Sequence, residues 1–279
     1  MVINDEKKNL AKVMFLRATR ENYEYLSSMG LFTPSPRTLV KSGKKLFELY
    51  CQKIIHRKVI YQDNELPSLS IELFFKPQNC ENTESYYNNL SSIDCYKISK
   101  SQINYTKRNV RKIKLWAVSH GFNVENIFFN IECACLPHII DDIVMLSHSL
   151  KKQGINLVIE LTEREYQYNE NSMKYCIYCL KDHDISIAID DFLSIFDHRY
   201  GIIPLVDYIK LIFPSDFHDR SWGEFRNLSF YLKEKYEKTL VVEKVETSEH
   251  IEFLSTLPFD LVQGYHFDKP SCIDKNVML

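Results

Sequence analysis

Short runs of apolar, β-branched and aromatic residues alternate along this chain with longer segments in which apolar positions recur every three or four residues. The short runs predict eight β-strands, at residues 59–62, 70–75, 127–132, 157–162, 186–192, 208–213, 240–246 and 261–267. The longer segments predict helices at residues 99–120, 139–152, 171–182, 220–238 and 248–257. This alternation is typical of βα units around a parallel sheet, and apolar strands covered by helices favour a closed barrel.

The beginning of the chain departs from the alternation. Only about seven residues separate the first two predicted strands, whereas a parallel crossover needs a dozen or more, so an antiparallel hairpin is expected there. Residues 41–58 are expected to form a helix that leads into the first strand. Residues 9–29 predict an earlier helix ending before Gly30, and Pro34 and Pro36 predict an extended linker. We therefore predict an α/β fold: a (β/α)8 TIM-type barrel over residues 45–279 with an antiparallel first strand, preceded by a short N-terminal helical extension and linker at residues 1–44.

Composition is that of a globular protein and excludes several other classes. Of the 279 residues 45% are hydrophobic and 26% are charged, and no apolar run approaches the ~20 residues of a membrane helix. The net charge of −2 gives no basic footprint for nucleic acid. The first residues lack the layout of a signal peptide, so the eight cysteines are expected to be reduced thiols. We expect a cytoplasmic protein with no membrane segment and no nucleic-acid partner.

Polar residues interrupt or end seven of the eight predicted strands. They are Glu72, Asn130, Glu160, Asp190, Asp191, Lys210, Glu243 and Gln263. In a (β/α)8 barrel the C-terminal ends of the strands meet at one face, where active sites lie. Carboxylates with one amide are ligands for hard cations such as Mg²⁺ or Mn²⁺, and an adjacent aspartate pair suits two metals that promote phosphoester cleavage. Taken singly, each of these residues is more often a helix N-cap or a loop residue, so spacing alone leaves both interpretations open.

Seven short motifs occur in the order found in one known family. They are SIELFF with a following lysine, FFNIE, IELTE, IAIDDF, DYIKL, VVEKVET and VQGYHFDKP. From about residue 45 to the C-terminus the sequence resembles the EAL-domain family of cyclic-di-GMP phosphodiesterases. The resemblance implies a (β/α)8 barrel, a homodimer, and hydrolysis of cyclic di-GMP to linear pGpG at a two-metal site holding Mg²⁺ or Mn²⁺.

The resemblance also implies a role for each matching residue. The implied metal ligands are Glu72, Asn130, Glu160, Asp190 and Asp191. Lys210 is implied to contact the water nucleophile, and Glu243 to lie beside that nucleophile and the second metal. Glu163 is implied to hold the loop after the aspartates. The implied substrate-binding residues are Lys76, Gln263 and Gln62, the last from a first-strand motif that is retained only as Tyr61-Gln62.

Several positions depart from the family pattern. Lys76 stands where the family has an arginine, and a lysine lacks the bidentate fork, so weaker substrate binding is expected. Residues 193–197 replace a glycine-rich loop that links metal binding to dimerisation in the family, and Lys244 replaces a glycine. The sequence therefore favours a metal-dependent phosphodiesterase. The alternative is a catalytically weak or inactive EAL protein that regulates by binding cyclic di-GMP or another protein. Residues 1–44 are a further candidate for docking a regulatory partner or DNA.

Overall fold

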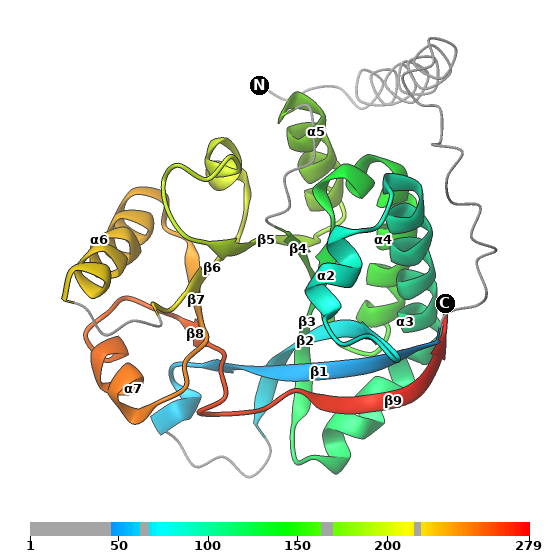
Figure 1. The fold of residues 1–279 in the computed structure, drawn as a ribbon, viewed down its shortest axis with the longest axis horizontal. Helices are drawn as coiled ribbons and strands as arrows, with labels where there is room; N and C mark the ends of the chain where they lie inside the picture. Colours follow the sequence, from blue (N-terminus) through cyan, green and yellow to red (C-terminus); the bar gives the residue numbers. More distant parts are fainter. Residues whose placement is uncertain (1–45, 62–66, 163–169, 215–218) are drawn as a thin grey trace. The chain divides into compact units, whose positions relative to one another are not determined.

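A computed structural model describes residues 46–61, 67–162, 170–214 and 219–279 of the chain. Eight strands of the described residues close a barrel (Figure 1). They are β1 (Leu46–His56), β2 (Ser68–Pro77), β3 (Asn123–Ile131), β4 (Asn156–Leu161), β5 (Ser186–Phe192), β6 (Tyr208–Ile212), β7 (Thr239–Glu243) and β8 (Leu261–Val262). Strands β2 to β8 are parallel and follow chain order around the barrel, and β1 closes it by pairing antiparallel with both β2 and β8. The predicted barrel class and its antiparallel first strand are confirmed.

The identity of the first strand was predicted wrongly. Residues Leu46–His56 form β1 where a helix was expected, and Val59–Tyr61, expected to be a strand, form a short 3-10 helix, η1. In β1 the buried outer residues Phe47, Leu49 and Cys51 alternate with Glu48, Tyr50 and Gln52, which is the period of two of a strand. Eight consecutive residues of β1 pair with β2, so long-range pairing decided the conformation of a segment whose local propensities are mixed.

Six helices of the described residues lie outside the ring of strands (Figure 1). They are α2 (Thr83–Asn88), α3 (Ser92–Ser119), α4 (Leu136–Lys151), α5 (Glu170–Lys181), α6 (Asp219–Tyr236) and α7 (Ser248–Leu254), with the short 3-10 helices η2 (Cys133–Cys135) and η3 (Tyr200–Leu205) between them. Side-chain caps begin some of them: the Ser91 side chain accepts from the Asp94 amide at α3, and Thr247 accepts from His250 at α7. The outward side chains of the strands pack against these helices in the larger hydrophobic core. No helix of the described part is long and apolar enough to span a bilayer.

One further strand was not predicted. Residues Ser271–Met278 form β9, which pairs antiparallel with the N-terminal part of β1 outside the closed barrel (Figure 1). The expected N-terminal extension at residues 1–44 lies outside the described residues and stays a prediction.

The barrel interior is sealed by an apolar layer. Its buried members are Ile54, Phe128, Val158, Ala188, Val241 and Leu261, with Tyr208 packed against them. Each comes from a different strand and points inward, because alternate side chains of a strand face opposite sides. We call this apolar layer the floor. The next inward-facing residue of each strand, toward the C-terminal face of the barrel, therefore lies directly above the floor.

Candidate functional site

A layer of polar side chains lies directly above the apolar floor, one from each barrel strand. Its members are Gln52 (β1), Glu72 (β2), Asn130 (β3), Glu160 (β4), Asp190 (β5), Lys210 (β6), Glu243 (β7) and Gln263 immediately after β8. On six strands the polar residue follows the floor residue by two positions, and on antiparallel β1 Gln52 precedes Ile54 by two. Strand periodicity thus collects residues that are far apart in sequence onto one level of the barrel.

Lys210 occupies the centre of this layer and is almost completely buried, with 1% of its side chain exposed. Its Nζ lies near four carboxylates: 2.5 Å from Glu160 Oε1, 2.8 Å from Asp190 Oδ1, 2.8 Å from Glu243 Oε1 and 3.2 Å from Glu72 Oε2. Burial by itself lowers the pKa of a lysine, but these carboxylates outweigh it and raise the pKa of Lys210 well above its usual value. The ammonium is therefore charged at any physiological pH.

Two of the carboxylates are buried enough to resist ionisation. Burial, and next the charge of Glu72, raises the pKa of Glu160 well above its usual value despite the ion pair with Lys210. Burial likewise raises the pKa of Glu243 to about 8, with Lys210 opposing the shift and Asp190 adding to it. The layer holds more negative charge than its one ammonium compensates.

Amide side chains fix the orientation of Glu72. Asn130 Nδ2 donates to Glu72 Oε1 at 2.8 Å, and Gln263 Nε2 donates to Glu72 Oε2 at 2.8 Å. Gln263 Nε2 also lies 3.1 Å from Gln52 Oε1, and Gln52 Nε2 donates to the Asp268 carbonyl oxygen at 2.9 Å. This chain of amides ties β1, β2, β3 and the segment after β8 into one rigid wall.

Gln52 was missed by the sequence analysis, which placed the glutamine of the first strand at Gln62. Because β1 is Leu46–His56, the inward glutamine of the first strand is Gln52, whereas Gln62 lies outside the described residues. The alternation of apolar and polar residues from Phe47 to Gln52 is the signal that could have identified it.

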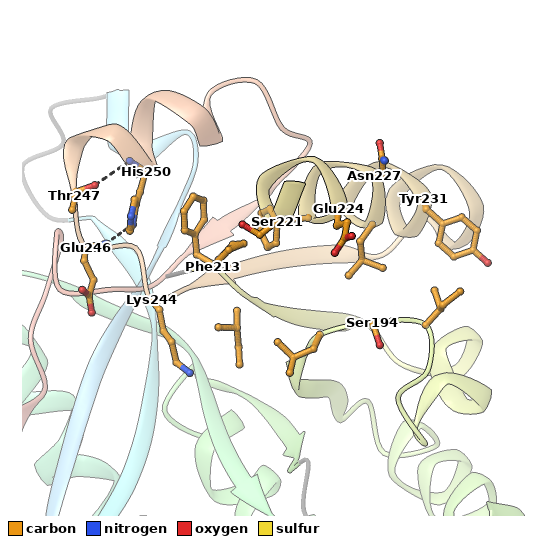
Figure 2. A pocket seen from close by; sticks show the side chains of 16 residues that line it. Ser194, Phe213, Ser221, Glu224, Asn227, Tyr231, Lys244, Glu246, Thr247 and His250 are labelled. Carbon is orange, nitrogen blue, oxygen red and sulfur yellow. Dashed lines mark hydrogen bonds between the residues drawn. The ribbon is translucent and has the colours of Figure 1, made fainter. Parts of the chain in front are cut away.

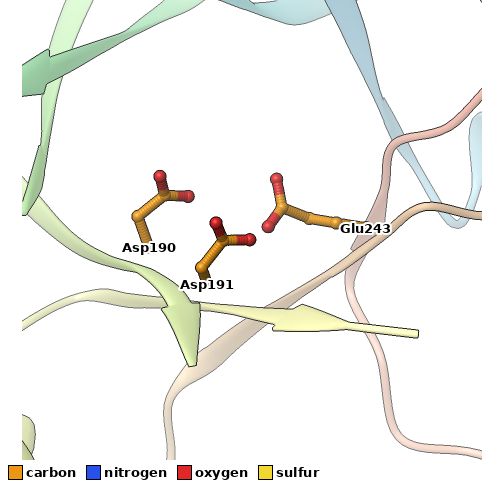
Figure 3. Close-up of side chains that lie close together, drawn as sticks. All are labelled: Asp190, Asp191 and Glu243. Atoms are coloured by element: carbon orange, nitrogen blue, oxygen red, sulfur yellow. The ribbon is translucent and has the colours of Figure 1, made fainter. Parts of the chain in front are cut away.

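An irregularity in β5 brings Asp191 to the same opening as Asp190. Consecutive residues of a regular strand point to opposite faces, but the pairing of β5 with β6 shifts register between Ile189 and Phe192, and Asp191 has φ of 45°. Figure 3 shows the carboxylates of Asp190, Asp191 and Glu243 facing one another across the opening. One ligand atom from each of the three lies within 4.8 Å of the others.

The residues present fit divalent cations. Four carboxylates, of Glu72, Glu160, Asp190 and Glu243, surround a single buried ammonium, and Asp191 lies beside Asp190 and Glu243. Within the described part of the chain, Oε2 of Glu160 and Oε2 of Glu243 are buried and receive no hydrogen bond. Clustered carboxylate oxygens with too few hydrogen-bond donors are the ligand set of Mg²⁺ or Mn²⁺.

A close backbone contact holds the ends of β7 and β8 together. A Cβ atom on Gly264 would lie 2.1 Å from the Val245 carbonyl oxygen, so this position requires glycine. The Val245 amide donates to the Gln263 carbonyl oxygen at 3.2 Å, and the His266 amide to the Val245 carbonyl oxygen at 3.0 Å. The contact therefore sets the positions of Gln263 and, through the end of β7, of Glu243.

The loop after β5 is anchored by a buried ion pair. The Arg199 side chain is fully buried; its Nη2 lies 2.7 Å from Asp197 Oδ2, and its Nη1 donates to the Leu161 carbonyl oxygen at 2.7 Å. Leu161 follows Glu160, so the pair ties the loop to the end of β4 beside the polar layer. The same loop exposes Leu193, Ile195 and Phe196, the last to 91%.

A groove of about 980 Å³ lies between this loop, α6 and the segment after β7 (Figure 2). Its walls include Ile212, Phe213, Phe225, Leu228, Lys244 and His250. Figure 2 shows Lys244 extending from the end of β7 toward the side of the groove where Ser194 lies.

Two other predicted site residues lie away from the polar layer or outside the described residues. Lys76 lies at the exposed end of β2, on the face shared by Glu72 and Phe74, and pairs across the sheet with Glu48. Glu163 lies outside the described residues. Glu132, at the end of the FFNIE motif, is buried, and its Oε2 accepts from Thr162 Oγ1 at 3.0 Å.

The sequence profile of the EAL domain family matches residues 104–270. The chain belongs to the EAL domain family. A probable cyclic di-GMP phosphodiesterase, PdeG of Escherichia coli K12, is 27% identical over 179 residues, which cover 62% of this chain and 34% of that protein. The chain thus spans about a third of the length of this relative.

Solved structures share the fold of this EAL domain. Klebsiella pneumoniae BlrP1, in a complex with calcium and cyclic di-GMP, superposes with a TM-score of 0.62 at 18% identity, covering 83% of this chain and 57% of that one. The same protein in a complex with manganese and cyclic di-GMP has a TM-score of 0.62 at 18% identity, covering 87% and 60%. The PaMucR phosphodiesterase, in a cyclic di-GMP complex, has a TM-score of 0.61 at 17% identity, covering 81% and 97%.

Proposed function

We propose that this EAL domain is a metal-dependent phosphodiesterase that hydrolyses cyclic di-GMP to linear pGpG. The observation that supports it most is the polar layer, in which four carboxylates contact the buried Lys210 above an apolar floor, with Asp191 beside them in the Asp190–Asp191–Glu243 cluster. The choice of cyclic di-GMP as substrate is supported by membership of the EAL domain family and by the cyclic di-GMP named for several similar proteins.

The proposed cation-holding residues are Glu72, Asn130, Glu160, Asp190 and Asp191, with Glu243 beside the aspartate pair. When bound, two divalent cations, Mg²⁺ or Mn²⁺, supply Lewis acidity toward the scissile phosphate and the attacking water. A buried site bordered by an apolar floor strengthens that electrostatic effect because it excludes bulk water.

The protein's own side chains would orient the water and handle its proton. Lys210 donates hydrogen bonds from a fixed position and cannot itself act as a base, because its pKa is raised well above the usual value. Without divalent cations, burial raises the pKa of Glu243 to about 8, so this carboxyl exchanges its proton near neutral pH. We assign the proton-accepting role to Glu243 and the water-orienting role to Lys210.

Substrate contacts are proposed for Gln263, Gln52 and Lys76. Gln263 and Gln52 present amides at the level of Glu72, and Lys76 offers a positive charge four residues further along β2 for a phosphate. Glu163 keeps its proposed role of holding the loop after the aspartates, and Gln62 stays a predicted substrate contact, although Gln52 is the glutamine found at the site.

The second candidate function is regulation by binding without efficient turnover. The loop 193–197 has no glycine, and three of its apolar side chains, Leu193, Ile195 and Phe196, are exposed to solvent. We propose this surface as the contact of a homodimer. A regulatory partner bound through residues 1–44, and a cytoplasmic location, stay predictions.

The deciding experiment incubates the purified protein with cyclic di-GMP and either Mg²⁺ or Mn²⁺ and separates the products by chromatography. We expect pGpG from the wild type and from Glu84→Ala, which removes an exposed carboxylate on α2, and none from Glu72→Ala. Intact nucleotide at high enzyme concentration with both metals would overturn the phosphodiesterase proposal. Calorimetry with cyclic di-GMP on the same protein then shows whether the binding function holds.

A further inference from the structure

A second lysine approaches the acidic cluster from the solvent side. Lys244 directly follows Glu243, and its Nζ lies 3.9 Å from Asp191 Oδ1. The Lys244 side chain is 58% exposed and that of Asp191 32% exposed, in contrast to the buried Lys210 on the inner side of the cluster. Asp191 is one of the three carboxylates that come within 4.8 Å of one another.

The backbone directs both partners of this pair toward the barrel mouth. Lys244 has φ of 59° and Asp191 has φ of 45°, so both are non-glycine residues in the left-handed region. Regular strand alternation would turn a residue after the inward Glu243 to the outside of the barrel. The left-handed turn instead carries the Lys244 side chain to Asp191, and the lysine therefore acts on the acidic cluster.

We propose that Lys244 is a built-in counter-ion of Asp191 that competes with a divalent cation for the Asp190–Asp191–Glu243 cluster. The inference rests on the proposed metal site and deepens it. Lys244 makes this cation position the weaker of the two and raises the divalent metal concentration that the protein needs. Lys210 does not have this role, because its side chain is only 1% exposed and four carboxylates enclose its ammonium.

The size of the effect follows from the exposure of the pair. An exposed pair of opposite single charges changes a binding constant by only up to about fivefold. The repulsion between the Lys244 ammonium and a bound divalent cation involves twice the charge on one partner, so its effect is correspondingly larger. Removing the Lys244 charge should therefore tighten the weaker cation-binding step by about threefold to tenfold. Because the pair is solvent-exposed, raising the salt concentration from about 0.05 M to about 0.5 M should shrink this difference.

The test measures metal binding directly. Mn²⁺ is titrated into the metal-free protein of residues 1–279, and free Mn²⁺ is followed by electron paramagnetic resonance, with calorimetry for stoichiometry. The wild type is compared with Lys244→Met, which removes the charge and keeps the length of the side chain, and with Lys244→Arg, which keeps the charge. Lys97→Met, at an exposed lysine of α3, is the matched control.

We expect Lys244→Met to bind the second Mn²⁺ more tightly, and Lys244→Arg and Lys97→Met to match the wild type. Unchanged or weaker Mn²⁺ binding in Lys244→Met would overturn the inference, and weakened binding of cyclic di-GMP in that variant would then assign Lys244 to the substrate. Absence of Mn²⁺ binding in every protein would overturn the proposed metal site itself. Because the readout is cation binding, loss of hydrolysis for another reason does not affect it.

Discussion

Replacing Lys210 by methionine isolates the electrostatic role of the buried ammonium. Methionine has a similar length and is apolar, so Lys210→Met removes the charge without opening a large cavity. The substitution leaves four carboxylates that lay 2.5 to 3.2 Å from Nζ without their common cation. The metal-free protein should therefore be strongly destabilised.

The magnitude follows from the burial of these groups. Breaking a buried ion pair by removing one partner costs about 3–5 kcal/mol. For a domain of this size 1 kcal/mol shifts the Tm by roughly 2–4 °C, so the Tm should fall by about 6–20 °C. The loss should be smaller at pH 5 than at pH 8, because burial already raises the pKa of Glu160 and Glu243, and these carboxylates take up protons when their cation is gone.

The assay is thermal unfolding in EDTA at pH 8, repeated with 10 mM MgCl₂. The matched control is Lys233→Met, which removes an ion pair with Asp260 at 2.7 Å from a side chain that is 34% exposed; its cost should be about 1 kcal/mol or less. Divalent ions should restore more stability to Lys210→Met than they add to the wild type, since they supply the missing positive charge. Equal Tm values for Lys210→Met and the wild type in EDTA would refute the view that this ammonium compensates buried negative charge.

Three further predictions test the framework of the site. Without divalent metal, the free energy of unfolding should decrease by at most about 5 kcal/mol as pH rises from about 4.5 to about 8, because the raised pKa of Glu243 makes the folded state hold a proton that the unfolded state releases. Urea unfolding of Glu243→Gln should show a weaker dependence on pH. The same pH dependence in both proteins would contradict this role of Glu243. Gly264→Ala should destabilise the protein by more than about 3 kcal/mol in thermal unfolding, because the added Cβ would collide with the Val245 carbonyl. Gly223→Ala in α6, where the added Cβ meets open space, should be neutral or stabilising. Similar Tm values for the two variants would be inconsistent with the close contact at Gly264. Arg199→Met should lower the free energy of unfolding, measured in urea, by about 3–5 kcal/mol, because it leaves the Asp197 carboxylate without its ion-pair partner. Adding Asp197→Asn to this variant should recover part of the loss. A loss below about 1 kcal/mol would show that the ion pair does not hold the loop in place.

The sequence alone was enough for most of the barrel and for most of the polar layer. The apolar runs of the seven parallel strands can be recognised from the local sequence. In a strand, a polar residue two positions after a buried residue lies on the same face. For that reason the periodicity of the strands was sufficient to assign Glu160, Lys210 and Glu243 to one end of the barrel. The seven motifs, in family order, added the chemistry that such residues perform.

The tertiary structure decided the segments whose local signals conflict. The residues of β1 include good helix formers, and only pairing with β2, β8 and β9 makes this segment a strand, so Gln52 was found only in the folded barrel. The placement of Asp191 depends on a break in strand pairing, and its approach to Lys244 depends on two left-handed residues that lie 53 positions apart. Sequence specifies the chemical groups, because periodicity is a local property. Distances between charges are set by barrel closure and by backbone irregularities, which depend on contacts among residues remote in the chain.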